Sequence, residues 1–164
     1  MLSNKIQEAL NDHLNAELYS SYFYLAMSAH LGSRNLNGCA NWMRVQAREE
    51  LEHAMKCFDY LNNQGGKVTL TAIEQPPTDW DSPLAVFEDA FRHEQKVTER
   101  INGLCGVAIG EQDHATGIFL QWFVTEQIEE EATFNDILHK LRLIGDDPGG
   151  LFMLDMELGK RGAA

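Results

Sequence analysis

Acidic side chains interrupt the apolar stripe of every long helix that this sequence predicts. The interruptions fall near the middle of each segment, at positions where burial is expected: Glu17, Glu50 with His53, Glu94, and Gln127 with Glu130. A buried, ionised carboxylate without a partner is costly, and four that face one another would be more so. Lysine and arginine are scarce at neighbouring inward positions, so salt bridges do not offset this cost. Two divalent cations would neutralise four carboxylates, and we therefore predict a binuclear metal site.

The ligand types indicate which metal would bind. Glu50 and His53 lie three residues apart, so both can reach one ion from a single helix face. Carboxylates with one imidazole suit iron or manganese, with zinc as a competitor. The three cysteines, Cys39, Cys57 and Cys105, show no spacing typical of structural zinc or of an iron–sulfur cluster. Iron is the preferred interpretation, because an open carboxylate site binds both oxidation states and leaves room for dioxygen.

Simpler interpretations stay open at this point. A single Glu-x-x-His pair arises often by chance, and the acidic run 129–131 is typical of a solvated helix face. The inward acids could also belong to a metal-free helical interaction module, or to a di-iron redox enzyme that acts on a peroxide or an organic substrate without mineral storage. Four matched interruptions together with the histidine favour the metal site over the metal-free alternative.

Long helices must position these residues. Only four prolines occur in 164 residues, and every long tract shows the helical period without sustained strand alternation. The short links make neighbouring helices antiparallel, whereas the link over 65–82 is long enough to run the length of a bundle. We predict an all-α fold, a single domain over 1–164 with four long helices, one long crossover and a short fifth helix; the helices span about 4–31, 37–63, 83–109, 112–144 and 150–159.

Composition excludes several classes of protein. The chain has 13 Lys and Arg against 25 Asp and Glu, a formal net charge of −12, so nucleic-acid binding is not expected. A content of 44% hydrophobic residues supplies a core and excludes a disordered chain. The N-terminal residues turn polar at once, and the longest apolar stretch, 22–31, is too short to cross a bilayer. We therefore expect a cytoplasmic protein with reduced thiols and no membrane partner.

The motifs that carry these residues resemble the ferritin family, specifically the prokaryotic non-haem ferritins. They occur in order and at family-like spacing over nearly the whole chain: ELYSSYFYLAM, REELEHAMK, HEQKVTERI and TEQIEEEATF. The resemblance implies a homo-oligomeric hollow shell of 24 subunits. It also implies a ferroxidase that oxidises Fe(II) with dioxygen or hydrogen peroxide at a di-iron centre and stores a ferric mineral inside the shell.

The resemblance also implies roles for individual residues of the centre. The first iron would be held by Glu17, Glu50 and His53, with Glu50 as the bridge to a second iron held by Glu94 and Glu130. The resemblance implies that Gln127 is an outer amide beside the second iron and that Tyr24 is a tyrosine next to the centre. It also implies a third iron site, found in prokaryotic members, that is formed by Glu49, Glu126, Glu129 and Glu130.

Departures from related families narrow this interpretation. A bacterioferritin would show a second Glu-x-x-His on the fourth helix, where this chain has Gln127-Ile128-Glu129-Glu130. The residue before His53 is Glu52, not the methionine that binds haem in bacterioferritins, so no haem is expected. Rubrerythrin would need a four-cysteine iron module. The resemblance places Gly117 and Leu120 where animal ferritins carry the acidic residues of a three-fold channel, which puts that entry route in doubt.

Overall fold

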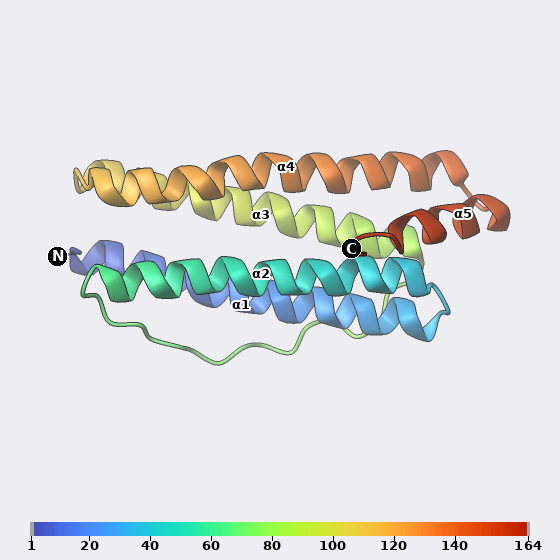
Figure 1. Cartoon of the computed structure of the whole chain (residues 1–164), viewed down its shortest axis with the longest axis horizontal. Helices are drawn as coiled ribbons and strands as arrows, with labels where there is room; N and C mark the ends of the chain where they lie inside the picture. Colours follow the sequence, from blue (N-terminus) through green and yellow to red (C-terminus); the bar gives the residue numbers. More distant parts are fainter. Residues whose placement is uncertain (1, 164) are drawn as a thin grey trace.

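The computed structural model describes residues 2–163, which form a bundle of four long helices and one short helix without strands. Figure 1 shows that α1 and α2 run antiparallel, that the crossover spans the length of the bundle, and that α3 therefore runs parallel to α2. The expected all-α bundle with one crossover is confirmed. The helices are α1 Asn4–Ser33, α2 Asn37–Asn63, α3 Pro83–Gly110, α4 His114–Ile144 and α5 Pro148–Leu158.

Side-chain caps set the starts of the helices, and they explain where the boundaries differ from those expected. The fourth helix begins at His114 rather than at 112, because Gln112 has φ 56° and Asp113 accepts a hydrogen bond from the Thr116 N–H at 3.0 Å. The fifth begins at Pro148 behind the capping side chain of Asp147. The first helix continues to Ser33, so a glycine at 32 does not end it.

The crossover is held on α1 by side-chain amides at a spacing of four residues. Gln7 accepts from the Lys67 N–H at 2.7 Å, and Asn11 accepts from the Thr69 N–H at 2.7 Å and donates to the Lys67 carbonyl at 2.9 Å. Asn15 repeats the pattern two residues further along the crossover: it donates to the Thr69 carbonyl and accepts from the Thr71 N–H. Four residues of helix rise about 6 Å, close to the rise of two extended residues, so the two periods match.

Two apolar clusters fill the bundle, one toward each end. The first is built around Tyr24, Phe87 and Phe134, and the second around Leu10 and Leu120. The inward acidic residues share the helices of both clusters and belong to neither. The centre of the bundle is therefore polar, between two dry segments.

The buried face of α1 shifts around the helix axis between the first and second halves of the helix. Leu25, which steps of three and four residues from Leu14 would bring inward, is 49% exposed, whereas Tyr24 and Met27 are fully buried. Steps of four residues along a helix of 3.6 residues per turn drift around the axis, so the buried face moves to earlier positions. This drift brings Tyr24 into the core with Glu17.

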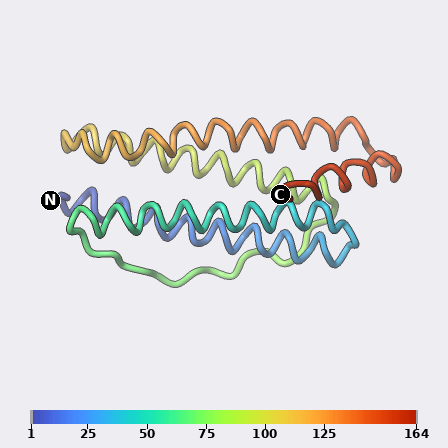
Figure 2. Tube along the Cα trace, in the orientation of Figure 1, coloured from blue at the N-terminus to red at the C-terminus, as the bar shows by residue number. Residues whose placement is uncertain are grey.

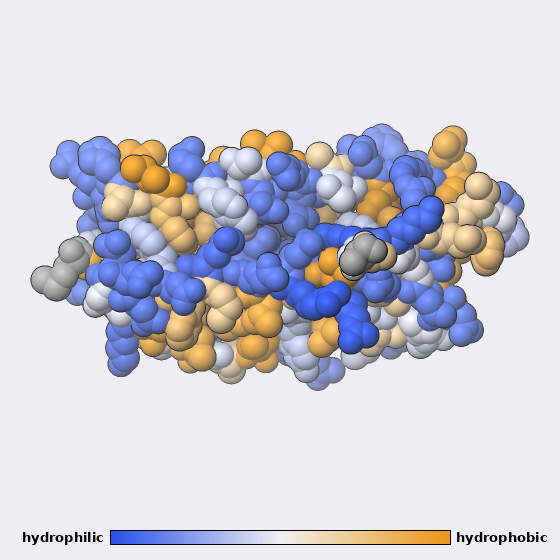
Figure 3. All heavy atoms as spheres, viewed as in Figure 1, coloured by the Kyte–Doolittle hydropathy of each residue, from blue (hydrophilic) through white to orange (hydrophobic). Residues whose placement is uncertain are grey.

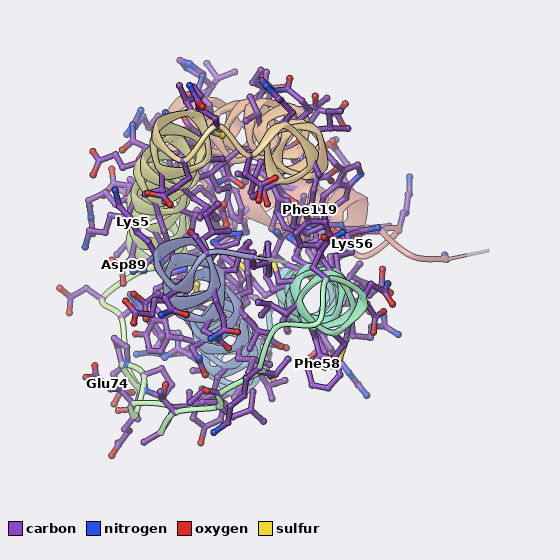
Figure 4. The ribbon with its side chains drawn as sticks, turned by 90° about the vertical axis from the view of Figure 1, so that its left-hand side faces the viewer. Lys5, Lys56, Phe58, Glu74, Asp89 and Phe119 are labelled. Carbon is purple, nitrogen blue, oxygen red and sulfur yellow. The ribbon has the colours of Figure 1, made fainter. Side chains whose placement is uncertain are left out.

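Aromatic side chains connect α2 to α4 across the bundle. Tyr60 stacks on Phe119 with 3.9 Å between ring centroids, and the Lys56 ammonium lies 4.4 Å from the centre of the Trp122 ring. Figure 4, viewed from the end of the bundle, labels Lys56 and Phe119 on this side. These contacts close the bundle beside His53, whose ring meets Trp122 edge-on at 5.1 Å.

The short helix α5 turns back over the start of α2 (Figure 2). The backbones approach so closely that a Cβ at Gly38 would lie 1.7 Å from the carbonyl oxygen of Asp155, so only glycine fits. The Asp155 carboxylate accepts a hydrogen bond from the Cys39 N–H at 2.8 Å, at the N-terminus of α2. Because Leu36 provides no side-chain cap, α5 supplies the capping carboxylate for α2.

The surface carries separate apolar patches among polar residues on the face seen in Figure 3. Over residues 2–163, no helix is both long enough and apolar enough to span a bilayer. On α5, Leu154 and Leu158 are buried as expected for an amphipathic helix, but Phe152 is 65% exposed. A free subunit thus leaves apolar side chains of α5 in water.

Candidate metal centre

A layer of polar side chains lies buried at the middle of the bundle, with contributions from all four long helices. Glu17 comes from α1, Glu50 and His53 from α2, Glu94 from α3, and Glu130 with Gln127 from α4. The four glutamates are between 1% and 5% exposed, and no lysine or arginine is buried in residues 2–163. Carboxylates buried at this density without a lysine or arginine beside them are typical of a metal centre.

Two amides tie the carboxylates together across the bundle. The Gln46 side-chain amide donates to Oε1 of Glu50 at 2.8 Å and to Oε2 of Glu130 at 2.9 Å, which joins α2 to α4. Gln127 donates to Oε2 of Glu94 at 2.6 Å and to its backbone carbonyl at 3.0 Å. Each amide fixes the orientation of a carboxylate that faces the centre.

Tyr24 completes the layer on the side of the first apolar cluster. Its hydroxyl donates a hydrogen bond to the Glu94 carboxylate, and its ring is fully buried. Burial, followed by the charge of Glu94, raises the pKa of Tyr24 well above its ordinary value. The phenol therefore stays protonated and remains a hydrogen-bond donor toward the centre.

The electrostatics of the layer favour protonated carboxyl groups when no cation is present. Burial, reinforced by Glu17, raises the pKa of Glu50 to about 8 despite the hydrogen bond from His53. Burial and the charge of Glu50 raise the pKa of Glu94 to about 8. Burial, with the charge of Glu94, raises the pKa of Glu130 to about 7. Several of these groups hold a proton near neutral pH, and a cation would displace it.

The histidine and Glu17 respond differently from the other carboxylates. Burial lowers the pKa of His53, but the carboxylates of Glu50 and Glu17 outweigh it and raise this pKa to about 9. Burial disfavours ionised Glu17, but the neighbouring His13 and His53 together hold its pKa below its ordinary value. Glu17 is thus the carboxylate that is ionised first, and it presents a charge to an arriving cation.

Two groups of side chains in the described residues have the geometry to hold an ion. In the first, ligand atoms of Glu17, Glu50 and His53 all lie within 4.8 Å of one another. In the second, His53, Glu126 and Glu130 meet the same condition. The donors are carboxylate oxygens and one imidazole, which suit iron, manganese or zinc. His53 belongs to both groups, so the two positions adjoin.

The other expected site residues lie around these groups. Glu94 belongs to neither group and bonds Tyr24 and Gln127 instead. Glu49 pairs with Arg161, whose guanidinium nitrogen lies 2.5 Å from its Oε2. Glu129 is exposed on α4. The expected third-site residues therefore come from two helices, α2 and α4, and they range from buried to exposed.

Three contacts of the centre were not foreseen from the sequence. Gln46 lies one turn before Glu50 on the inward face of α2, and an amide at that spacing is the sequence signal for its role. His13 lies fully buried, with its Nε2 3.1 Å from Oε1 of Glu17. Its spacing of four residues from Glu17 was also visible in the sequence. Arg161 comes from the chain after α5, and no local pattern indicates that it meets α2.

The structure bears on the entry route that the sequence put in doubt. Leu120, at the position of an acidic channel residue of animal ferritins, is 0% exposed and lies in the second apolar cluster with Leu104 and Phe123. A side chain buried within its own subunit cannot line a channel between subunits. Gly117 does line a surface pocket at the junction of α3 and α4, together with His114.

Comparison with known proteins identifies the family to which this chain belongs. The model of the Ferritin-like domain matches residues 7–144, which include the whole polar layer. The chain belongs to the ferritin family. It is 42% identical over 161 residues to the bacterial non-heme ferritin of Bacteroides fragilis (strain 638R), covering 98% of this chain and 100% of that relative. It is 43% identical over 159 residues to a probable bacterial non-heme ferritin-like protein of Haemophilus influenzae, covering 97% and 96% of the two chains.

A solved structure agrees with this ferritin closely. The open-pore ferritin of the hyperthermophilic archaeon Archaeoglobus fulgidus superposes with a TM-score of 0.97 at 54% identity, covering 98% of this chain and 99% of that one. The expected resemblance to non-haem ferritins is confirmed. The family supports iron storage with ferroxidase activity, and the relatives do not favour a di-iron enzyme without mineral storage.

Proposed function

We propose that this ferritin oxidises Fe(II) to Fe(III) at a di-iron centre in the middle of its helical bundle. This proposal rests mainly on the buried group of Glu17, Glu50 and His53. Their ligand atoms lie within 4.8 Å of one another, and no lysine or arginine is buried among residues 2–163 to neutralise them. These three residues would bind the first iron. The donor set fits Fe(II), which accepts both carboxylate oxygen and imidazole nitrogen.

The second iron would be held by Glu94 and Glu130, with Glu50 as the bridge. Gln46 supports this arrangement, because one amide group contacts both Glu50 and Glu130. Gln127 orients Glu94 from the outside. A third iron would be held by acidic residues of α2 and α4, of which Glu126 and Glu130 already form a group with His53: Glu49, Glu126, Glu129 and Glu130.

The chemistry of the paired site follows from charge and electron count. Two Fe(II) ions give up two electrons, and dioxygen with two protons accepts them to form hydrogen peroxide. Negative carboxylates stabilise the product charge, so ionised Glu17, Glu50, Glu94 and Glu130 favour Fe(III). The protons that Fe(II) displaces from Glu50 and Glu94 are released where protons are consumed. Tyr24 keeps Glu94 oriented as the charge changes.

Storage requires that subunits enclose a space. We propose a homo-oligomeric shell of 24 subunits in the cytoplasm, formed by the whole chain 1–164 as one domain. Exposed apolar side chains on α5 support an interface there, since Phe152, Met153 and Met156 are 58% to 72% exposed. The cysteines Cys39, Cys57 and Cys105 are free thiols, which supports a reducing compartment.

Aerobic addition of Fe(II) to the apoprotein tests this function. We expect the absorbance of Fe(III) to rise rapidly while ultracentrifugation shows a particle that gains mass without change of radius. Glu50→Ala should abolish the rapid phase, whereas Glu52→Ala, at an exposed position on the same helix, should keep it. Oxidation by Glu50→Ala at the wild-type rate would contradict the bridging role, and a monomer in the centrifuge would contradict the shell.

A further inference from the structure

His13 is a buried histidine beside the centre that the proposed function does not use. It lies on α1 one turn before Glu17, and none of its side chain is exposed. Neither ring nitrogen has a hydrogen-bond partner among the described residues. The ring packs edge-on against Phe123 with 5.1 Å between centroids. Buried polar atoms without a partner are rare in folded proteins, so these nitrogens indicate a ligand that is neither side chain nor backbone.

The contact between His13 and Glu17 has the geometry of two ligands of one ion. Nε2 of His13 lies 3.1 Å from Oε1 of Glu17, yet the atoms are not aligned for a hydrogen bond. Two ligand atoms about 2.0 to 2.2 Å from one ion, at roughly 90 to 110° to each other, lie about 2.8 to 3.6 Å apart. The contact within the expected centre, between Nδ1 of His53 and Oε2 of Glu50, measures 3.3 Å and falls in the same range.

The spacing in the sequence supports the same interpretation. Residues four apart on a helix share one face, and two ligands at that spacing chelate zinc in well-known helical motifs. The second oxygen of Glu17, Oε2, also lies buried without a hydrogen-bond partner. Glu17 therefore has one oxygen toward His13 and another free for a different ion.

We propose that His13 Nε2 and Glu17 Oε1 bind a divalent transition-metal ion at a position next to the di-iron centre. Imidazole with carboxylate selects Zn²⁺, Fe²⁺ or Co²⁺ over Mg²⁺ and Ca²⁺, which take oxygen ligands alone. His13 lies outside the group formed by Glu17, Glu50 and His53, so this is an additional position joined to the first through Glu17. The proposal rests on the proposed function only through that shared carboxylate.

Crystals of the full-length protein soaked in Zn²⁺, which does not change oxidation state, test the position directly. In the wild type we expect an anomalous difference peak that places a zinc ion within bonding distance of both His13 Nε2 and Glu17 Oε1. His13→Phe should lose this peak and keep the zinc at Glu50 and His53, because phenylalanine fills the ring space without nitrogen. His53→Ala should do the reverse. Zinc bound at His13 but absent from Glu50 and His53 would contradict the proposed di-iron centre and would support the site at His13.

Equilibrium dialysis against Zn²⁺ gives a second readout. We expect His13→Phe to bind about one ion fewer per subunit than wild type, whereas His139→Gln, which alters an exposed histidine of α4, should bind as many. The apoprotein of His13→Phe should still fold and assemble, since phenylalanine fills the space of the ring, although the interaction that lowers the pKa of Glu17 is lost. If that variant fails to assemble, His13→Gln replaces it. Wild-type crystals without zinc bonded to His13 Nε2 overturn the proposal.

Discussion

The hydroxyl of Tyr24 on α1 donates a hydrogen bond to the Glu94 carboxylate on α3. Both side chains are buried, with 0% and 1% of their surface exposed. The bond connects the first apolar cluster, to which the Tyr24 ring belongs, with the polar layer that holds Glu94. The orientation of Glu94 therefore depends on packing in the core as well as on its neighbour Gln127.

Replacement of Tyr24 by phenylalanine should weaken this connection without emptying the centre. Glu94, with a pKa raised to about 8, is mostly protonated at neutral pH in the apoprotein, so loss of this buried hydrogen bond should cost about 1 kcal/mol of stability. Oxidation of Fe(II) should slow several-fold while the number of bound Fe(II) ions stays the same, as measured by stopped-flow absorbance and anaerobic titration. Tyr22→Phe, at a 47% exposed position on the same helix, is the control. Unchanged oxidation kinetics in Tyr24→Phe would contradict the positioning role.

The iron positions should respond separately to substitution. His53→Ala should weaken the first position and slow the rapid oxidation, because the only imidazole of that group is removed. Glu130→Ala should affect the second and third positions together. Glu129→Ala, at an exposed position, should change the iron stoichiometry or later turnover more than the initial rapid phase. A rapid phase that Glu129→Ala abolishes and Glu130→Ala leaves intact would reverse these assignments.

Metal affinity should rise with pH between about 6 and 9. The pKa values of Glu50 and Glu94 are raised to about 8 and that of His53 to about 9, so a cation competes with protons at these groups. Each proton displaced makes the affinity up to about tenfold higher per pH unit below the pKa. We expect Co²⁺ binding at pH 8 to be at least about tenfold tighter than at pH 6. Equal affinity at both values would contradict the raised pKa values.

The same shifts predict the pH dependence of apoprotein stability. A carboxyl group with a raised pKa holds its proton in the folded chain and loses it in the unfolded chain above about pH 4.5. Its contribution to stability is complete below that pH and is lost as pH rises through about 8. Thermal unfolding should show that Co²⁺ raises the melting temperature more at pH 8 than at pH 6, because the cation replaces the lost protons.

Arg161 should compete with the third iron position. Its guanidinium pairs with Glu49 and lies 4.1 Å from the centre of the Trp42 ring, so a cation at Glu49 must displace it. We expect Arg161→Gln to increase the affinity of the weakest iron position about two- to fivefold, since exposed ion pairs contribute up to about 1 kcal/mol. Lys160→Gln alters the exposed neighbour and should bind iron as wild type does. Weaker binding in Arg161→Gln would show that the arginine orders the site instead.

The attachment of the crossover should depend on Asn11. Its amide makes hydrogen bonds to the backbone of Lys67 and Thr69, and Asn11→Ala would leave both backbone groups without these partners. We expect a loss of about 1 to 3 kcal/mol, measured as a lower midpoint in guanidinium unfolding. Asp12→Ala, which is exposed on the same helix, should leave the midpoint within error. An equal shift in both variants would assign the effect to α1 as a helix rather than to the crossover.

The bundle and the inward acids could be predicted from the sequence because both depend on local, periodic patterns. The seam of α2 repeats at three and four residues, so it placed Glu50 and His53 inside together with Gln46. Scarce prolines and the long link at 65–82 then predicted the crossover. Periodicity alone would also place Leu25 inward, but it is exposed, since the steps of three and four residues drift around the axis of a long helix.

Contacts between distant segments were decided by the tertiary structure alone. Nothing near Arg161 in the sequence indicates Glu49, because the pairing depends on how α5 turns back at Gly38. The hydrogen bonds of Asn41 to the backbone of Gly159 and Arg161 likewise depend on how the end of the chain packs against α2. Local periodicity therefore determined which residues face inward, whereas the partner that each inward or surface side chain meets depends on rigid-body packing, which brings together residues more than 100 positions apart.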